Sequence, residues 1–238
     1  MTIRVATYNV HGMRDSVPAL SRVTAAMRAD VLCVQEAPRF GRWRSKRAAL
    51  AAAAGLRVAT PGRLGGVAVL AGPRVTVLHA ERHALRVFLG LERRGLAVAV
   101  LAAEGATLAV GSLHLDLNDP ARLHHAAEAV ALMEGVAARY GAAIVLGGDI
   151  NERPHQPAWR YLAGRLADCH AVAPKGDAVK PKGDGLTFPA KDPSARIDGV
   201  FAARETQVVS CGGVDTESTD LAAASDHLPV VAELRLGL

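Results

Sequence analysis

The sequence predicts an α/β fold in which two β-sheets pack face to face and helices cover their outer faces. Segments with strand character outnumber helical ones, strands do not alternate strictly with helices, and neighbouring strands can pair as hairpins. These features disfavour a Rossmann sheet or a TIM barrel. The 238 residues are 50% hydrophobic and show no break in composition, so we predict a single domain over residues 1–238.

The first third of the chain mixes strands with two helices. Ile3–Val10 is rich in β-formers and alternates, which predicts a strand. A helix is predicted over Ser16–Ala29, because Ser16 can cap it and Pro18 is tolerated in a first turn. The alanine-rich segment Trp43–Ala54 predicts a second helix. Further strands are predicted over Val31–Glu36, Leu56–Thr60, Gly66–Leu70 and Val75–His79.

The middle of the chain predicts hairpins, followed by a long helix. Ala97–Ala102 can pair with Leu85–Leu91 or, across a glycine-containing turn, with Thr107–His114. Pro120–Tyr140 predicts the long helix, which Gly141 closes. The remaining predictions are strands over Ala142–Gly147, Ile197–Phe201, Thr206–Ser210 and Pro229–Leu236, a short helix over Pro157–Gly164 and a loop over Ala173–Gly185.

Charge and cysteine content limit the class of protein. The formal net charge of +5 is compatible with polyanionic partners but is weak support for them. Cys33, Cys169 and Cys211 are far apart among apolar residues, which indicates reduced thiols rather than disulfides or a zinc site. No signal peptide or membrane span is visible. We therefore expect a cytoplasmic protein; its oligomeric state stays open, with a monomer as the simplest form.

Polar residues collect where the predicted strands end. Because strand ends of packed sheets share a rim, these side chains can converge although they are distant in sequence. Carboxylates and amides suit a hard cation such as Mg²⁺, and imidazoles beside it suit phosphoryl chemistry. The residues are Asn9, Glu36, His114, Asp116, Asp149, Asn151, Asp198, Asp226 and His227.

Seven short segments around these residues occur in a characteristic order. Together they span Thr7–Val230 and resemble the endonuclease/exonuclease/phosphatase superfamily, which includes type I DNase and inositol polyphosphate 5-phosphatases. The resemblance implies a four-layer sandwich of two mixed, mostly antiparallel sheets. It also implies a Mg²⁺-dependent phosphoester hydrolase in which Mn²⁺ can replace Mg²⁺. The segments are TYNV, QE, GGVAVL, SLHLD, GGDIN, RIDGVF and SDHLPV.

The resemblance implies that three residues lie at the metal. Glu36 would be the principal ligand. Asn9 would contact the metal or its waters, or would position the catalytic aspartate. Asp226 would lie in the coordination shell or beside it, although Asp in this sequence context also caps turns.

Five residues carry the catalytic roles that the resemblance implies. Asp149 would orient or deprotonate the attacking water, and Asn151 would hold that water or a phosphate oxygen. Asp198 would set the tautomer of His227, which would contact the phosphate or take a proton. His114 would donate to a phosphate oxygen. Whether His227 or Asp149 is the general base stays open.

For some residues near the candidate site a structural role is also compatible with the sequence. Gly147 and Gly148 are predicted to let the backbone turn tightly before the aspartate in GGDIN, a segment that also fits an Asx-type turn. The role of Asp116 is undecided. Arg122 and His125 are assigned to the surface or packing of the long helix, without chemistry.

Two basic segments bear on the substrate. The segment Ala37–Arg47 interleaves basic residues with Phe40 and Trp43, which suits phosphate backbones and stacked bases. It equally fits the solvated start of a helix. A lysine-bearing loop at Lys175, Lys180 and Lys182 could close over an anion. The candidate nucleic-acid contacts are Arg39, Arg42, Arg44, Lys46 and Arg47.

Three functions are compatible with these residues. The first is a metal-dependent phosphodiesterase or nuclease that cleaves nucleic acid by in-line attack of an activated water. The alternative is a phosphatase or phosphodiesterase for a small-molecule or lipid-headgroup phosphoester. A catalytically inactive binding module is disfavoured, because every expected acidic and imidazole position is filled.

Overall fold

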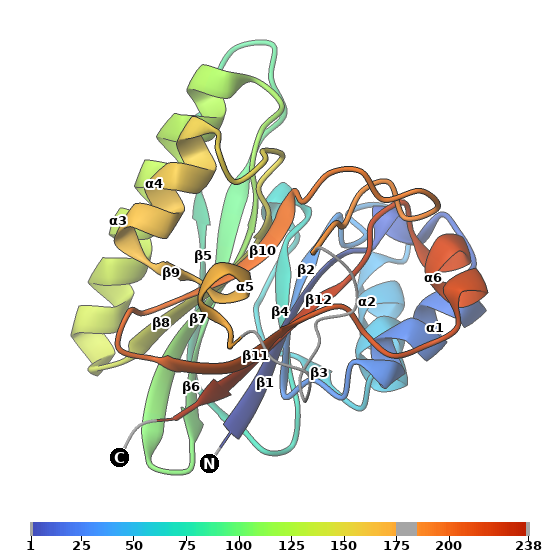
Figure 1. Ribbon diagram of the computed structural model, residues 1–238, viewed down its shortest axis with the longest axis horizontal. Helices are drawn as coiled ribbons and strands as arrows, with labels where there is room; N and C mark the ends of the chain where they lie inside the picture. The colour runs from blue at the N-terminus through green and yellow to red at the C-terminus, as the bar shows by residue number, and fades with distance from the viewer. Residues whose placement is uncertain (1, 175–184, 237–238) are drawn as a thin grey trace.

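The computed structural model describes residues 2–174 and 185–236, and its two sheets lie face to face (Figure 1). In the first sheet the strand order is β11-β12-β1-β2-β4-β3, and in the second it is β5-β6-β7-β8-β10-β9. The first sheet consists of β1 (Thr2–Asn9), β2 (Val31–Gln35), β3 (Arg57–Val58), β4 (Ala68–Ala71), β11 (Gln207–Gly212) and β12 (Val230–Arg235). The second consists of β5 (Thr76–Ala84), β6 (Gly95–Ala103), β7 (Ala106–His114), β8 (Ala143–Asp149), β9 (Ala167–Asp168) and β10 (Asp198–Ala202).

Both sheets are mixed and mostly antiparallel, as predicted. The parallel pairs among the described strands are β1 with β2 and β7 with β8. Between the sheets lies an apolar layer in which Val5 and Val69 of the first sheet pack with Val110, Val145 and Val200 of the second. Burial of these side chains supplies the main driving force that holds the sheets together.

Helices form the two outer layers of the sandwich (Figure 1). Leu20, Val23 and Leu50 of the helices on the first sheet pack against Ala6 and Tyr8 of β1. The helices on the first sheet are α1 (Val17–Ala26), α2 (Trp43–Ala53) and α6 (Ser218–Ala224). On the second sheet lie α3 (Asp119–Tyr140) and α4 (Pro157–Arg165), and the short elements are α5 (Cys169–Val172) and the 3-10 turns η1 (His11–Met13) and η2 (Leu64–Gly66). No helix within the two described ranges has the length and apolarity needed to cross a membrane.

The helix ends follow the predicted capping chemistry. The Ser16 hydroxyl accepts a hydrogen bond from the Ala19 amide at 3.3 Å and caps α1. Asn118 caps α3 in the same way through the Ala121 amide. Gly141 ends α3 with a φ of 59°, a left-handed conformation in which glycine has no Cβ penalty.

One predicted strand does not form. Leu85–Leu91 is irregular, and β6 pairs instead with β5, which extends to Ala84 opposite Gly95. The segment ends in a turn with Gly90 at a φ of 80°, and Leu89 is 99% exposed. Apolar content therefore misled the prediction there. The predicted lysine-bearing loop, with Lys175, Lys180 and Lys182, lies outside the described residues.

The two glycines of GGDIN serve a different purpose from the one predicted. Gly147 and Gly148 lie inside β8, and neither has a positive φ. A Cβ on Gly147 would stand 2.9 Å from the Cβ of Cys33 across the sandwich, and one on Gly148 would stand 2.5 Å from the Leu113 carbonyl oxygen. Gly147 therefore leaves room for the Cys33 side chain of the other sheet, and Gly148 for the backbone of β7, and neither makes a tight turn.

We expect Gly147→Ala to lower the free energy of unfolding by about 1–3 kcal/mol, the usual cost of overpacking a core. Chemical denaturation measures the change. Gly135→Ala is the matched control, because Gly135 lies on the exposed side of α3 with open space around a new Cβ. The control is expected to be neutral or to stabilise by about 0.5–1 kcal/mol. Equal stability of the two variants would contradict this account of Gly147.

Candidate active site

The candidate site lies where the central strands of both sheets end. His114 ends β7 and Asp149 ends β8, and the two are register partners. Asp198 begins the antiparallel strand β10 opposite Asp149. Strand register therefore places these three residues in one row, and Asn9 at the end of β1 faces them from the other sheet, with its side chain in contact with Asp149.

Asp149 is the centre of the polar contacts. Its Oδ2 accepts a hydrogen bond from Asn9 Nδ2 at 3.0 Å, and it lies 3.4 Å from His114 Nε2 and 3.7 Å from His227 Nε2. Its Oδ1 accepts from the Asn151 amide at 3.0 Å. Burial, followed by the nearby Asp198, raises the pKa of Asp149, while both histidines and Asn9 oppose that shift. Three residues predicted from separate motifs, Asn9, His114 and His227, therefore meet at one carboxylate.

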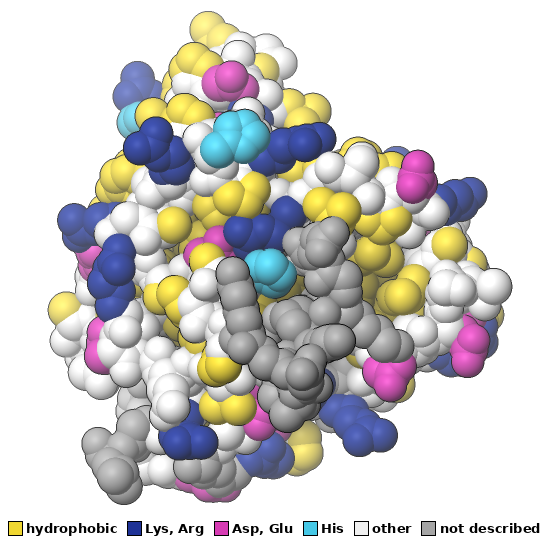
Figure 2. All heavy atoms as spheres, in the orientation of Figure 1, with side chains coloured by type: hydrophobic (Ala, Val, Ile, Leu, Met, Phe, Trp, Pro, Cys, Tyr) yellow, Lys and Arg dark blue, Asp and Glu magenta, His cyan; other side chains and the backbone are white. Residues whose placement is uncertain are grey.

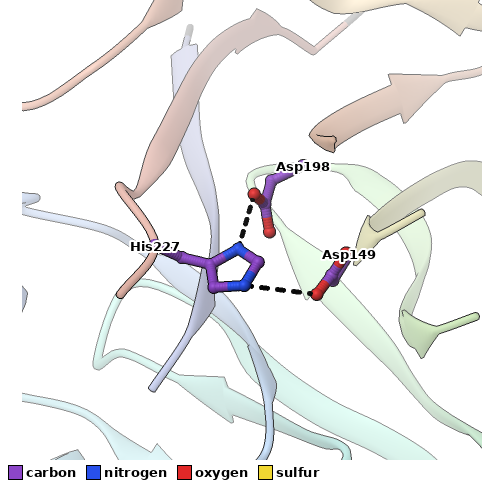
Figure 3. Close-up of side chains that lie close together, drawn as sticks. All are labelled: Asp149, Asp198 and His227. Carbon is purple, nitrogen blue, oxygen red and sulfur yellow. Dashed lines mark hydrogen bonds and ion pairs between the residues drawn. The ribbon is translucent and has the colours of Figure 1, made fainter. Parts of the chain in front are cut away.

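His227 is held between two carboxylates (Figure 3). Its Nδ1 lies 2.9 Å from Asp198 Oδ2, and its Nε2 points toward Asp149. Because a carboxylate accepts, the Nδ1 carries the proton in this pair, and Nε2 is left to act on other groups. Burial lowers the pKa of His227, but Asp198 and Asp149 outweigh it and raise the pKa to about 9.

The loop ahead of β10 holds this pair in place. The Thr187 hydroxyl accepts from the backbone amides of Ile197 and Asp198 at 3.1 and 3.2 Å. The ring of Phe188 lies 4.9 Å from the His227 ring between centroids. The amide contacts hold the backbone of Asp198 in place, and Phe188 packs beside the ring of His227.

His114 has the opposite electrostatic character. Burial lowers its pKa; Asp149 opposes the shift and Arg94 adds to it, and the outcome is a pKa of about 4. At neutral pH the ring is therefore uncharged and keeps one N–H donor. A neutral donor beside Asp149 suits a hydrogen bond to a phosphate oxygen.

Asn9 and Glu36 form the edge of the site that belongs to the first sheet. Asn9 Nδ2 donates to Glu36 Oε1 at 3.2 Å as well as to Asp149, and Asn9 Oδ1 accepts from the His11 amide at 3.0 Å. Because the Asn9 side-chain nitrogen donates to both carboxylates, this geometry favours a role for Asn9 in positioning Glu36 and Asp149 over direct contact with the metal. Glu36 itself adopts a φ of 49°, directly after β2.

The oxygen donors of the site fit a divalent cation. Glu36 and Asp226 line the same pocket, and Asp226 is half-buried with its Oδ1 3.8 Å from His11 Nδ1. Asp198 Oδ1 is buried without a hydrogen-bond partner among the described residues, which shows unused acceptor capacity nearby. A set dominated by carboxylate oxygens matches the preference of Mg²⁺ or Mn²⁺. Asp149, Asp198 and His227 also cluster within 4.8 Å, and within this cluster His227 Nδ1 is hydrogen-bonded to Asp198.

The pocket beside these residues has a volume of about 420 Å³. Glu36, Asp226 and His114 form its acidic and imidazole side. Its basic side consists of Arg14, Arg39, Lys46 and Arg94, with Phe40 at the rim and 75% exposed. The pocket thus combines a cation-binding side with an anion-binding side.

The basic segment after Glu36 contributes less to this pocket than predicted. Arg39 and Lys46 line it, whereas Arg42 and Arg44 do not. Arg47 is buried, with only 2% of its surface exposed, so the prediction that it contacts nucleic acid is wrong. It donates instead to four backbone carbonyls, those of Ala37, Pro38, Gly62 and Val67.

No continuous basic band crosses the visible part of the face in Figure 2, where Lys and Arg side chains are dispersed. Arg44 rests on the Trp43 ring, with its guanidinium carbon 4.5 Å from the ring centroid. Aromatic and basic residues in this segment therefore also serve local packing.

The remaining predicted residues have clear positions. Asn151 uses one amide hydrogen on the Leu115 carbonyl at 3.0 Å and keeps the other. Asp116 is buried, accepts from the Asn118 amide at 2.9 Å, and lies 3.4 Å from Arg94.

Arg122 and His125 belong to the packing of α3, as assigned. Arg122 is buried and donates to Glu152 at 2.8 Å, and His125 is buried as well. Sequence reasoning overlooked His11, Arg14 and Arg94 at the pocket. Arg94 could have been found from the sequence, because it is a charged residue directly before the apolar strand β6.

One family model and several solved structures match the chain. A family model described as Endonuclease/Exonuclease/phosphatase family matches residues 6–227. An endonuclease/exonuclease/phosphatase structure from Bacteroides vulgatus is 19% identical, with 100% of both chains covered and a TM-score of 0.78. A mannosyl-6-phosphatase from Bacteroides thetaiotaomicron is 17% identical, covers 98% of this chain and 100% of its own, and has a TM-score of 0.77.

The catalytic domain of human nocturnin, which carries a bound sulfate, has the same fold. It is 14% identical over 99% of this chain and 95% of its own, with a TM-score of 0.77. No curated protein sequence matches the chain.

Proposed function

The chain belongs to the Endonuclease/Exonuclease/phosphatase family of phosphoester hydrolases, and on that premise we propose that it is a divalent-metal-dependent phosphodiesterase acting on nucleic acid. One observation carries the proposal: Asp149, Asp198 and His227 meet within 4.8 Å at the ends of β8, β10 and the segment before β12. Glu36 and a pocket with four cationic side chains adjoin them.

The side chains divide the reaction among them. Asp149 orients the attacking water or accepts a proton from it. Its Oδ2 faces three polar side chains, and its pKa is raised. His227, with Nδ1 held by Asp198, presents Nε2 toward the same point and donates to a phosphate oxygen or the leaving group. Neutral His114 donates to a second phosphate oxygen.

Glu36 and Asp226 would hold the divalent cation, and Asn9 would orient Glu36 and Asp149. When bound, the cation neutralises charge that builds on the phosphate oxygens. Asn151 would bind the water or a phosphate oxygen through its remaining amide hydrogen.

We expect Glu36→Gln to weaken Mn²⁺ or Mg²⁺ binding by about tenfold or more, because it removes a negative ligand while it retains the side-chain volume. Isothermal titration calorimetry with the metal alone measures the affinity. Glu104→Gln is the control, since Glu104 lies in the β6–β7 turn away from the pocket. Equal metal affinity of the Glu36 variant and the wild type would contradict the assignment.

The substrate class is tested with a panel of phosphoesters. Purified protein with Mg²⁺ is incubated with plasmid, abasic-site duplex, RNA, bis-p-nitrophenyl phosphate and p-nitrophenyl phosphate. EDTA and Asp149→Ala serve as controls. Cleavage of the diesters, nucleic acid included, is expected; release from the monoester alone would overturn the phosphodiesterase proposal.

A phosphatase for a small-molecule phosphoester is the second candidate. The pocket of about 420 Å³ is compact, and a structure of the same fold is described as a mannosyl-6-phosphatase. The panel above separates the two candidates.

The three cysteines are buried and free, which supports a reducing, cytoplasmic location as part of the proposal.

A further inference from the structure

Two arginines on the basic side of the pocket share one carboxylate. Glu92, in the segment before β6, forms a hydrogen bond with Arg39 through Oε1 and lies 3.4 Å from Arg94 Nη1 through Oε2. Arg39 comes from the segment after Glu36, and Arg94 precedes β6, so two separate segments meet here. All three residues line the same pocket as His114 and Asp226.

Arg94 is buried but incompletely paired. Only 6% of its surface is exposed, and its contacts with Glu92 and Asp116 are both 3.4 Å. Strong charge-assisted hydrogen bonds of guanidinium groups are about 2.7–2.9 Å long. Arginine carries five donors in a planar fork that matches phosphate geometry. Among the described residues, Arg94 is thus flanked by two carboxylates at the long limit of hydrogen-bond distance, and it borders the pocket.

The backbone that carries Arg94 is rigidly placed. Gly65 of η2 packs so closely that a Cβ would stand 2.5 Å from the Gly95 amide nitrogen. The Ala37 amide donates to the Gly66 carbonyl at 2.7 Å, which ties the same turn to the segment after Glu36. The backbone segments that carry the two arginines therefore pack against the same turn.

The charges of the pocket are not balanced by one phosphodiester. Four cationic side chains line it, against the carboxylates of Glu36, Glu92 and Asp226, and the buried carboxylate of Asp116 contacts Arg94 beside it. A divalent cation adds two positive charges, and a phosphodiester supplies one negative charge. A further anionic group is therefore electrostatically favoured.

Glu92 shows what such an anion would experience. Burial raises its pKa, but the hydrogen bond from Arg39 and the charges of Arg94 and Arg39 lower it below the usual value. The two guanidinium groups thus stabilise negative charge between them. Glu92 is also accessible, with 45% of its side chain exposed, so a ligand can reach the position that it holds.

We propose that Arg39 and Arg94 form a binding subsite for a second phosphate group of the substrate, beside the phosphoester that is cleaved. This inference rests on the proposed function and deepens it. The substrate phosphate takes the position of the Glu92 carboxylate on the two guanidinium groups. The preferred substrate is a short nucleotide chain that bears a terminal phosphate, and Phe40 at the pocket rim offers an exposed face to a base.

The test compares dithymidine monophosphate with its 5′-phosphorylated and 3′-phosphorylated forms, in the presence of Mg²⁺. Cleavage of at least one phosphorylated form is expected to exceed that of the unphosphorylated form by about ten- to hundredfold in kcat/KM, through a lower KM. Arg39→Gln and Arg94→Lys are expected to reduce this ratio toward one. Arg94→Lys retains the positive charge, so the neighbouring buried carboxylates keep a cation beside them. It loses the planar set of guanidinium donors that can bind phosphate in a bidentate way.

Two further variants complete the design. Glu92→Gln removes the internal carboxylate and is expected to tighten binding of inorganic phosphate, measured by calorimetry without metal, whereas Arg39→Gln weakens it. Arg44→Gln is the control for a lost basic charge, because Arg44 stacks on Trp43 outside the pocket. It should leave the ratio at the wild-type value.

The outcomes separate this inference from the proposed function. Equal cleavage of all three dinucleotides by the wild type, or a ratio that Arg39→Gln leaves unchanged, overturns the subsite while the phosphodiesterase proposal stands. A protein that cleaves no phosphodiester refutes the proposed function. In that case, unaltered phosphate binding by Arg39→Gln would refute the subsite as well, and weakened binding would support it as an anion site.

Discussion

Replacement of His227 by alanine is expected to lower kcat by about 10²–10⁴-fold and to leave divalent-metal affinity at the wild-type level. The side chain is 7% exposed, its Nδ1 is held by Asp198, and its Nε2 faces Asp149. Removal of the ring thus deletes a proton donor or acceptor at the reacting phosphate. The carboxylates of Glu36 and Asp226 remain for the metal. Steady-state kinetics and metal titration measure the two effects.

His124→Ala provides the control for this variant, because His124 lies on the exposed side of α3, outside the pocket. The control should retain full turnover. Asp198→Asn keeps the volume of the carboxylate but weakens the partner of the His227 Nδ1–H, so it should also reduce kcat. Full turnover by His227→Ala would remove His227 from the mechanism.

Arg47→Met is expected to lower the free energy of unfolding by about 3 kcal/mol or more. The guanidinium donates to the Pro38 carbonyl at 2.9 Å and to the Gly62 carbonyl at 3.0 Å, with longer bonds to Ala37 and Val67. Methionine fills much of the space but leaves these buried carbonyls without a donor. Denaturant unfolding measures the loss.

The same substitution should also reduce activity, because Arg47 joins the segment after Glu36 to the turn that precedes β4. Arg44→Met is the matched control: its guanidinium is exposed and stacks on Trp43. We expect the control to change stability by less than about 0.5 kcal/mol. Similar stability losses in both variants would contradict the assigned role of Arg47.

The fold class followed from local patterns that are strong in this chain. Apolar strands such as Val31–Gln35, and capped helices such as the one after Ser16, each have a local cause in side-chain periodicity or hydrogen bonding. Family resemblance then supplied the four-layer arrangement. Leu85–Leu91 misled the prediction, because an apolar run is compatible with either a strand or a loop until its neighbours are known.

The polar residues of the candidate site were predicted because the end of a buried strand is an unusual position for Asn9, Glu36 or Asp149 in a purely structural role. Their neighbours were less visible. Gly147 is required by the approach of Cys33 from the other sheet, and nothing in GGDIN reveals that distance. The same holds for Arg94, whose distances to Glu92 and Asp116 arise from three-dimensional packing.

The order of residues along the chain by itself determined the layered α/β architecture and the identity of the acids, amides and imidazoles that meet in the candidate site. Those properties depend on periodicity and chemical type, which are local. Tertiary structure alone decided which basic side chains line the pocket: Arg39 and Arg94 do, whereas Arg47 lies buried among carbonyls. The physical reason is that burial and pairing of a charge depend on the segments that fold against it, and these are distant in sequence.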